Sequence, residues 1–354
     1  MEKHRLVDTP DYRYIFNNEN GTLVRWGCKK EIDPLYSPLG PEILDIEVST
    51  ICNGIDSIPC THCYKENNGN GTNMTFGMFE RIFRKIPRVL TQIAFGIGDI
   101  SANLDLPQML RFCRENDYNQ VIPNITTNGF GILDKHIEMF SQYCGAVGVS
   151  RYGNKDLCYD TIDRLKKAGV KQVNMHLLVS EETEERCYET IQESLEDERL
   201  KGLHAILFLL LKPKGSKNRY HQLKIEKLRK LLKKALDEKT RIALDSCCGP
   251  IFIEMIKDHP AYQRLLEQSE PCEGTLFSGY INVDGMFYPC SFTEEATGGL
   301  NVLECNDFLM DVWYNPKTND FRRNLLSHDG DRKCPTFDLY HDCSSCSGVC
   351  QNVS

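Results

Sequence analysis

The sequence predicts an α/β protein: an open, partial (β/α)6 TIM-like barrel followed by a cysteine-rich C-terminal domain. Two observations predict this fold. Extended apolar runs alternate with helical patterns six times between residues 43 and 240, which is typical of parallel strands covered by helices. Six units are too few for the eight of a closed barrel. Beyond residue 240, nine of the 17 cysteines lie between Cys247 and Cys350.

We therefore expect three parts: residues 1–42 as an N-terminal hairpin lead-in, 43–240 as the barrel, and 241–354 as the cysteine-rich domain. Residues 12–16 and 22–26 have the pattern of a β-hairpin, which we expect to cover one edge of the sheet. The six predicted strands are 43–49, 92–98, 120–127, 146–150, 172–179 and 204–211. The six predicted helices are 75–90, 107–115, 133–143, 157–168, 182–195 and 223–236.

Composition excludes some classes of function. A net charge of −8 argues against general nucleic-acid binding, because phosphate contacts are made mostly by Lys and Arg. The longest apolar run, residues 205–211, is too short to cross a membrane, and the N-terminus lacks the apolar core of a signal peptide. We expect a cytoplasmic protein, and in that reducing compartment clustered cysteines are more often metal ligands than disulfides.

One cysteine motif directly follows the first predicted strand. Cys52, Cys60 and Cys63 have the spacing CX7CXXC. Three thiolates are one short of the four that hold a four-iron cluster, which leaves one iron for a substrate or cofactor. The alternative is structural zinc, which prefers four ligands, and His62 inside the CXXC pair is poorly placed to be the fourth. We therefore favour the iron–sulfur interpretation.

Polar and glycine-rich loops follow the next strands. Gly96-Ile-Gly98-Asp99 follows the second strand, Thr126-Thr-Asn128-Gly129 the third, and Ser150-Arg151 the fourth. In parallel α/β folds, functional residues gather at the carboxyl ends of the strands. The sequence therefore predicts a site built from these loops together with the cysteine loop.

With these motifs in this order, the chain resembles the radical S-adenosylmethionine (SAM) enzymes over roughly residues 43–215. Members of that superfamily hold a [4Fe–4S] cluster through three cysteines after the first strand of a partial (β/α)6 barrel, and SAM chelates the fourth iron. The resemblance implies that Cys52, Cys60 and Cys63 are the cluster ligands, although the usual first gap is three residues rather than seven. Asp99 stands where the family usually has Glu. The SAM contacts that the resemblance implies are made by Tyr64, Gly96, Gly98, Asp99, Asn128, Ser150, Arg151 and Leu210.

The C-terminal cysteines resemble the SPASM/twitch domain of radical SAM enzymes that modify peptides and proteins. Cys272, Gly285 and Cys290 match the start of its pattern, around a hairpin that we expect to turn at Asp284-Gly285. The resemblance implies at least one auxiliary [4Fe–4S] cluster; a zinc ribbon is the alternative. The candidate ligands are Cys247 or its neighbour Cys248, Cys272, Cys290, Cys334, Cys343, Cys346 and Cys350. Single cysteines in the predicted helices are interpreted as small core residues.

The resemblance implies hydrogen abstraction from a substrate by a 5′-deoxyadenosyl radical, with a peptide or protein as the preferred substrate. It also implies a low-potential electron donor such as flavodoxin or ferredoxin. Two alternatives stay open: a radical SAM enzyme acting on a small metabolite or nucleotide, and a non-catalytic, zinc-stabilised binding protein. Sulfatase-maturing relatives carry an Asp where this chain has Ser291, which disfavours that activity. The residues do not identify a catalytic acid or base.

Overall fold

The structure is a computed structural model that describes residues 3–27, 34–55, 57–65, 67–96, 98–246, 249–266 and 272–326. The candidate auxiliary-cluster ligands Cys247, Cys248, Cys334, Cys343, Cys346 and Cys350 lie outside these residues. No helix in the described ranges is both long enough and apolar enough to cross a membrane.

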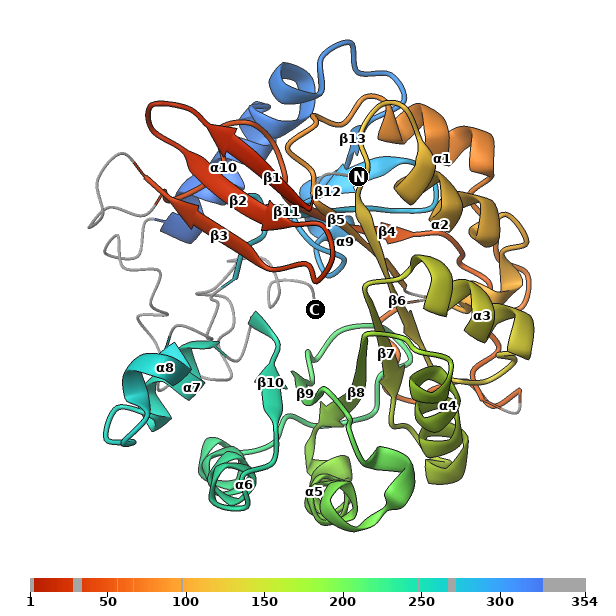
Figure 1. Ribbon diagram of the computed structural model, residues 1–354, viewed down its shortest axis with the longest axis vertical. Coiled ribbons are helices and arrows are strands. Elements are labelled where there is room, and N and C mark those ends of the chain that lie inside the picture. The colour runs from red at the N-terminus through yellow and green to blue at the C-terminus, as the bar shows by residue number, and fades with distance from the viewer. Residues whose placement is uncertain are drawn as a thin grey trace.

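A curved, ten-stranded sheet organises the described chain, in the order β10-β9-β8-β7-β6-β5-β4-β11-β12-β13 (Figure 1). Neighbouring strands from β4 to β10 are parallel. These strands are β4 (Ile43–Glu47), β5 (Gln92–Gly96), β6 (Ile122–Thr127), β7 (Ala146–Ser150), β8 (Gln172–Val179), β9 (Ala205–Leu210) and β10 (Ile242–Leu244). The predicted partial barrel is confirmed, and its first six strands are those expected from the sequence.

A helix follows each of these six strands and lies on the outer side of the sheet (Figure 1). The helices are α1 (Phe76–Phe83), α2 (Leu106–Glu115), α3 (Asp134–Tyr143), α4 (Lys155–Lys167), α5 (Glu184–Glu196) and α6 (Ile225–Asp237). Helix α1 is shorter than the predicted span of 75–90. The residues after it form turns around Pro87, whose ring disfavours a helical conformation at the residue before it.

Alternate side chains along the strands separate the core from the inner face. Leu44 and Ile46 of β4 are buried against the helices, while Asp45 and Glu47 point to the opposite face of the sheet. On β8, Met175 belongs to the helix-side core and its neighbour His176 faces inward. The inner face is therefore polar at these positions of β4 and β8, whereas the helix side is apolar.

The N-terminal segment forms a separate three-stranded antiparallel sheet of β1 (His4–Asp8), β2 (Arg13–Asn17) and β3 (Leu23–Trp26). The predicted hairpin is confirmed as β2 and β3, and β1 is an additional strand. Tyr14 Oη donates to the Val89 carbonyl at 2.9 Å, and Arg5 to the Leu90 carbonyl at 2.7 Å. Both carbonyls precede β5, so this sheet packs at the amino ends of the barrel strands rather than along an edge.

The C-terminal part continues the same sheet. β11 (Ser278–Ile281) pairs in parallel with β4, and β12 (Met286–Tyr288) and β13 (Leu300–Asn301) add to it antiparallel. The predicted hairpin at Asp284-Gly285 is confirmed, since Tyr280 pairs with Tyr288 and Gly285 has φ +79°. The domain boundary at residue 240 stays a prediction, but the sheet runs across it. The helices of this part are α7 (Gly249–Met255), α8 (Tyr262–Leu266), α9 (Glu294–Thr297) and α10 (Pro316–Leu326).

The single cysteines that lie outside the motifs and within the described residues are core residues. Cys113, Cys144, Cys158 and Cys187 are buried among apolar side chains on the helix side of the sheet, and Cys305 is buried in the same way near the C-terminal strands. Burial raises the pKa of the Cys113, Cys144, Cys158 and Cys187 thiols, which keeps them protonated and unreactive.

Candidate functional site

The cysteine loop leaves the carboxyl end of β4 and forms a small turn in its long first gap. The Ile55 and Ile58 backbones exchange two hydrogen bonds, of 3.2 and 2.9 Å. Gly54 has φ +77°, and a Cβ there would lie 1.8 Å from the Ile58 carbonyl oxygen. Ile58 is 70% exposed. The described residues of the long gap, from Gly54 to Ile58, therefore form a turn on the surface, and only glycine fits at its start.

The three thiols of this loop share one half-buried environment. Burial is the main cause that raises the pKa of Cys60 to about 11, and the nearby Cys63 and Cys52 raise it further. In the described part of the chain, no three His, Cys, Asp or Glu side chains converge on a point that could hold one metal ion. A four-iron cluster does not require such convergence, because each thiolate binds a different iron. Three thiols close enough that Cys52 and Cys63 raise the pKa of Cys60 are the donor set that such a cluster uses.

The loop after β5 packs directly on the cysteine loop. Gly98 has φ +83°, and a Cβ there would lie 2.2 Å from the Ser49 carbonyl oxygen. The Asp99 backbone N–H donates to the Ile51 carbonyl at 2.9 Å. The Asp99 carboxylate accepts from the Ser101 N–H at 2.9 Å and from the Ser101 hydroxyl at 2.6 Å. Gly98 thus permits a close approach of two backbones that no other residue would allow.

The next two rim loops follow in the predicted order. Gly96 lies beside β6, since a Cβ on it would be 3.3 Å from Thr126 Cβ. Asn128 accepts from the Phe130 N–H at 2.9 Å, which shapes the turn after β6. Ser150 is 5% exposed at the end of β7. The structure therefore brings Gly96, Asn128 and Ser150 to the same rim as the cysteine loop.

Arg151 and Leu210 reach this rim with their backbones, while their side chains turn outward. Arg151 is 5% exposed and its guanidinium carbon lies 5.7 Å from the centre of the Tyr159 ring on α4. Leu210 is packed in the core between β9 and α6. Because side chains alternate along a strand, the preceding residues Ser150 and Leu209 point into the barrel. The SAM contacts predicted at these two positions stay predictions, and the side-chain directions leave only the backbone to make them.

A loop that sequence reasoning missed lies over the cysteine loop. Gly215, after β9, has φ +91°, and a Cβ on it would lie 2.6 Å from Tyr64 Cα and 2.7 Å from the Cys63 carbonyl oxygen. The Arg219 N–H donates to the Thr61 carbonyl at 2.9 Å, and Lys217 Nζ to the Asn67 carbonyl at 3.1 Å. The only signal in the sequence was a glycine in a loop after the sixth strand.

His62, inside the CXXC pair, lies among aromatic rings. Its ring centre is 4.8 Å from that of Tyr152 and 5.3 Å from that of Tyr220. Burial lowers the pKa of His62 to about 4, so the imidazole is neutral near pH 7. Its buried Nδ1 has no hydrogen-bond partner among the described residues. A buried polar atom of this kind is rarely left unsatisfied, so an ordered water or a bound ligand would supply its partner.

Tyr64 and Lys65 connect the cysteine loop to the C-terminal part. The Tyr64 ring stacks on Phe292 with centres 4.2 Å apart, and its hydroxyl donates to Ser291 at 3.0 Å. Lys65 Nζ lies 2.5 Å from Glu294 and 3.2 Å from Glu47. Ser291 directly follows Cys290, so the turn that carries this cysteine is anchored on the cysteine loop.

Cys272 and Cys290 lie in neighbouring segments. A Cβ on Gly274 would be 3.7 Å from Cys272 Sγ and 3.0 Å from the Pro289 carbonyl oxygen. The segment that carries Cys272 and Gly274 therefore lies against the residue before Cys290. Both cysteines are half-buried. Their roles as auxiliary-cluster ligands stay predictions, because the other candidate ligands are outside the described residues.

Comparison with solved structures gives the fold class. Streptococcus suis SuiB bound to S-adenosylmethionine matches with a TM-score of 0.70 and 15% identity, over 99% of each chain. SuiB bound to its precursor peptide SuiA matches with a TM-score of 0.67 and 15% identity, over 90% of each chain. The enzyme anSMEcpe with bound AdoMet and the Cp18Cys peptide matches with a TM-score of 0.60 and 20% identity, over 79% of this chain and 82% of that one.

No protein-family model and no curated protein matches the sequence. SuiB and anSMEcpe are radical SAM enzymes. The chain therefore has the fold of radical SAM enzymes, with a C-terminal extension like theirs, and the resemblance predicted from the sequence is confirmed at the level of the fold.

Proposed function

We propose that this protein is a radical SAM enzyme that modifies a peptide or protein. One observation carries the proposal: the loops after β4, β5 and β9 pack on one another around the three cysteines, through Gly98 and Gly215. These contacts join the cysteine loop to the loop after β5, which the resemblance assigns to SAM, and to the loop after β9. The solved structures that share the fold were obtained with S-adenosylmethionine and with peptides bound, which supports the same assignment.

Cys52, Cys60 and Cys63 would hold a [4Fe–4S] cluster, and the rim residues would hold SAM next to it. Such a cluster supplies a low-potential electron that cleaves SAM to a 5′-deoxyadenosyl radical. The chain's own residues position and shield this chemistry. Gly98 lets the loop after β5 pack against the backbone before the cysteine loop, His62 Nδ1 offers a buried polar atom, and the loop around Gly215 covers the cysteine loop.

Cys272 and Cys290 would bind at least one auxiliary cluster, placed close to the first by the contact of Tyr64 and Lys65 with the turn after Cys290. A low-potential electron donor such as flavodoxin or ferredoxin would reduce the enzyme. A small metabolite or nucleotide remains the second candidate substrate, because the inner face carries polar side chains such as Asp45, Glu47 and His176 that suit either class. A precursor-peptide gene next to this gene would favour the peptide.

Anaerobic reconstitution with iron and sulfide tests the proposal. We expect a brown protein that cleaves SAM to 5′-deoxyadenosine when a reductant is added. The variants Cys52→Ala, Cys60→Ala and Cys63→Ala should each lose cleavage and about four irons per chain. Cys305→Ala, a buried cysteine outside the motifs, should keep both. A colourless zinc protein without cleavage would refute the proposal and favour the zinc-stabilised binding protein.

A further inference from the structure

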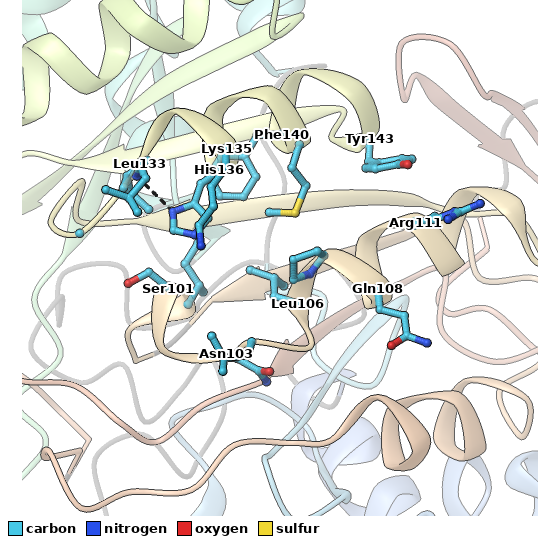
Figure 2. A pocket seen from close by; sticks show the side chains of 16 residues that line it. Ser101, Asn103, Leu106, Gln108, Arg111, Leu133, Lys135, His136, Phe140 and Tyr143 are labelled. Carbon is cyan, nitrogen blue, oxygen red and sulfur yellow. Dashed lines mark hydrogen bonds between the residues drawn. The ribbon is translucent and has the colours of Figure 1, made fainter.

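A cavity of about 630 Å³ lies outside the barrel, between the 3₁₀ turn Ile100–Ala102, α2 and α3 (Figure 2). Figure 2 shows α2 along one side of it and α3 along the other. Sixteen residues line the cavity, and Leu106, Met139 and Phe140 form much of its apolar wall. Ligand sites in proteins commonly have this size and a mostly apolar lining.

Two large apolar side chains at this cavity are exposed to solvent. Leu104 is 85% exposed and Leu133 is 56% exposed, and both line the cavity. Clustered exposed apolar residues around a concavity are typical of a binding surface. Single exposed leucines also occur elsewhere: Leu195 on α5 is 54% exposed and does not line this cavity.

The charges at the cavity have one sign. Its lining includes the cations Arg111 and Lys135 and no Asp or Glu. Arg111 pairs with Glu115 at 2.6 Å, but these side chains are 67% and 47% exposed, and such surface pairs contribute little free energy. A carboxylate on a ligand can therefore compete for Arg111 and approach Lys135. The lining suits an apolar group that carries a negative charge beside it.

Some residues that line the cavity also contact the loops of the proposed SAM site. Ser101, which lines the cavity, donates to Asp99 at 2.6 Å. Asn103, also in the lining, donates to the Val48 carbonyl at 2.7 Å, just before the cysteine loop. Gly131 lies in the loop that begins at Asn128 and meets Ser101. A ligand in the cavity would touch the loops that hold the site without entering the barrel.

We infer that this cavity binds a segment of the peptide substrate that lies away from the reacting residue, with two or three apolar side chains next to acidic ones. The inference rests on the proposed peptide substrate. The volume exceeds that of one side chain, and a groove between two helices accepts the apolar face of a short helix. The exposed Leu104 and Leu133 would be covered by that face, and Arg111 and Lys135 would meet its acidic residues.

Fluorescence anisotropy on the anaerobically reconstituted full chain tests the inference. The probe is a labelled 14-residue helical peptide with Leu at positions spaced i, i+3, i+4 and i+7 and Glu elsewhere. Two comparison peptides carry Lys in place of Glu, or Ser in place of Leu. We expect the Glu peptide to bind more tightly than either, by about tenfold or more, because both apolar and charged contacts contribute.

Variants locate the binding. Leu104→Asp combined with Leu133→Asp should weaken binding of the Glu peptide about tenfold or more, and Lys135→Glu should weaken it severalfold. Leu195→Asp is the matched control and should bind as the parent does. All four positions are at the surface, so thermal unfolding should be little changed. Equal binding by the double variant, or equal binding of the Lys peptide, would overturn the inference.

The two proposals fail in different ways. The Leu104/Leu133 double variant should still cleave SAM, because neither side chain belongs to the rim site. Peptide binding at the cavity by a protein that never cleaves SAM would refute the proposed function, and with it the assignment of the bound segment to a substrate, while showing that the cavity binds apolar, acidic peptides. Binding of the apolar anion anilinonaphthalene sulfonate without binding of the Glu peptide would show a small-molecule cavity and overturn the peptide assignment.

Discussion

Lys65 Nζ lies 2.5 Å from the carboxylate of Glu294. Lys65 is two residues after Cys63 and Glu294 is four residues after Cys290, so this ion pair connects the two cysteine-bearing segments. The same ammonium donates to Tyr280 Oη at 3.1 Å and lies 3.2 Å from Glu47 on β4. Glu47 is 1% exposed and Lys65 is 10% exposed. This buried network holds the two cysteine-bearing segments against one barrel strand.

The network predicts a strong effect of Lys65 on stability. Lys65→Met should lower the free energy of unfolding by about 3–5 kcal/mol, because it leaves the buried Glu47 carboxylate without its cation. Urea unfolding of the cluster-free protein measures this change. Lys233→Met is the matched control, since its partner Asp237 and Lys233 itself are 62% and 72% exposed. Its loss should stay below about 1 kcal/mol; similar losses for the two variants would contradict the network's role.

Gly98 should not tolerate a side chain. In Gly98→Ala the new Cβ would lie 2.2 Å from the Ser49 carbonyl oxygen, in a backbone conformation with φ +83°. Either the cysteine loop or the loop after β5 must move, so we expect SAM binding to weaken by about tenfold or more and the chain to lose more than about 1 kcal/mol. Equilibrium dialysis with SAM measures the first effect and urea unfolding the second.

Gly77→Ala is the control for this substitution. A Cβ at Gly77 meets no atom within 4 Å and the residue lies in α1, so this variant should bind SAM normally and be slightly more stable. Unchanged SAM binding in Gly98→Ala would show that the loop after β5 takes no part in the site.

The burial of His176 leads us to expect that the stability of the protein depends on pH. Burial lowers the pKa of this inward-facing imidazole from 6.5 to about 4. The unfolded chain therefore takes up a proton on His176 below pH 6.5 while the folded chain does not. Stability is fully present above pH 6.5 and falls as the pH drops towards 4, by about 1–3 kcal/mol for a side chain that keeps some exposure.

Urea unfolding of the cluster-free protein between pH 7.5 and 4.5 (about three pH units) checks this prediction. His176→Gln should flatten part of the decline, because it removes the titrating group. His4→Gln, at an exposed position of β1, should leave the decline unchanged. Parallel curves for His176→Gln and the parent would rule out His176 as a source of the decline.

Cys272 and Cys290 should separate SAM cleavage from product formation. Substitution of either by Ala should remove about four irons per chain, because the proposed auxiliary cluster loses a ligand. Cleavage of SAM should persist, since Cys52, Cys60 and Cys63 remain. Iron analysis and the electron paramagnetic resonance spectrum of the reduced protein report the loss. An unchanged iron content in both variants would refute the auxiliary cluster at these residues.

Much of the fold could be predicted because its signals are local. The strands β7 and β8 have the predicted bounds, since short apolar runs between helical patterns leave few alternatives. The order of the cysteine, glycine and serine loops after successive strands also predicted the rim, because parallel strands place all their carboxyl ends on one side.

Other features depend on the tertiary structure. The Lys65–Glu294 contact joins residues 229 positions apart, and no local pattern indicates such a pair. The need for glycine at position 215 becomes clear only from the backbone of Tyr64, which lies too close for a side chain there. The direction of Arg151 follows from the alternation of β7, which turns its side chain to α4 although its neighbour Ser150 faces the rim.

Residue types and their short-range spacing are enough to predict the succession of strands and helices and the three thiols of the cysteine loop. The loops that cover that motif, the docking of the C-terminal hairpin and the cavity with exposed leucines behind the rim could not be predicted in this way. These features arise where segments distant in the chain pack together, and packing depends on the shape of both partners rather than on the pattern of either one.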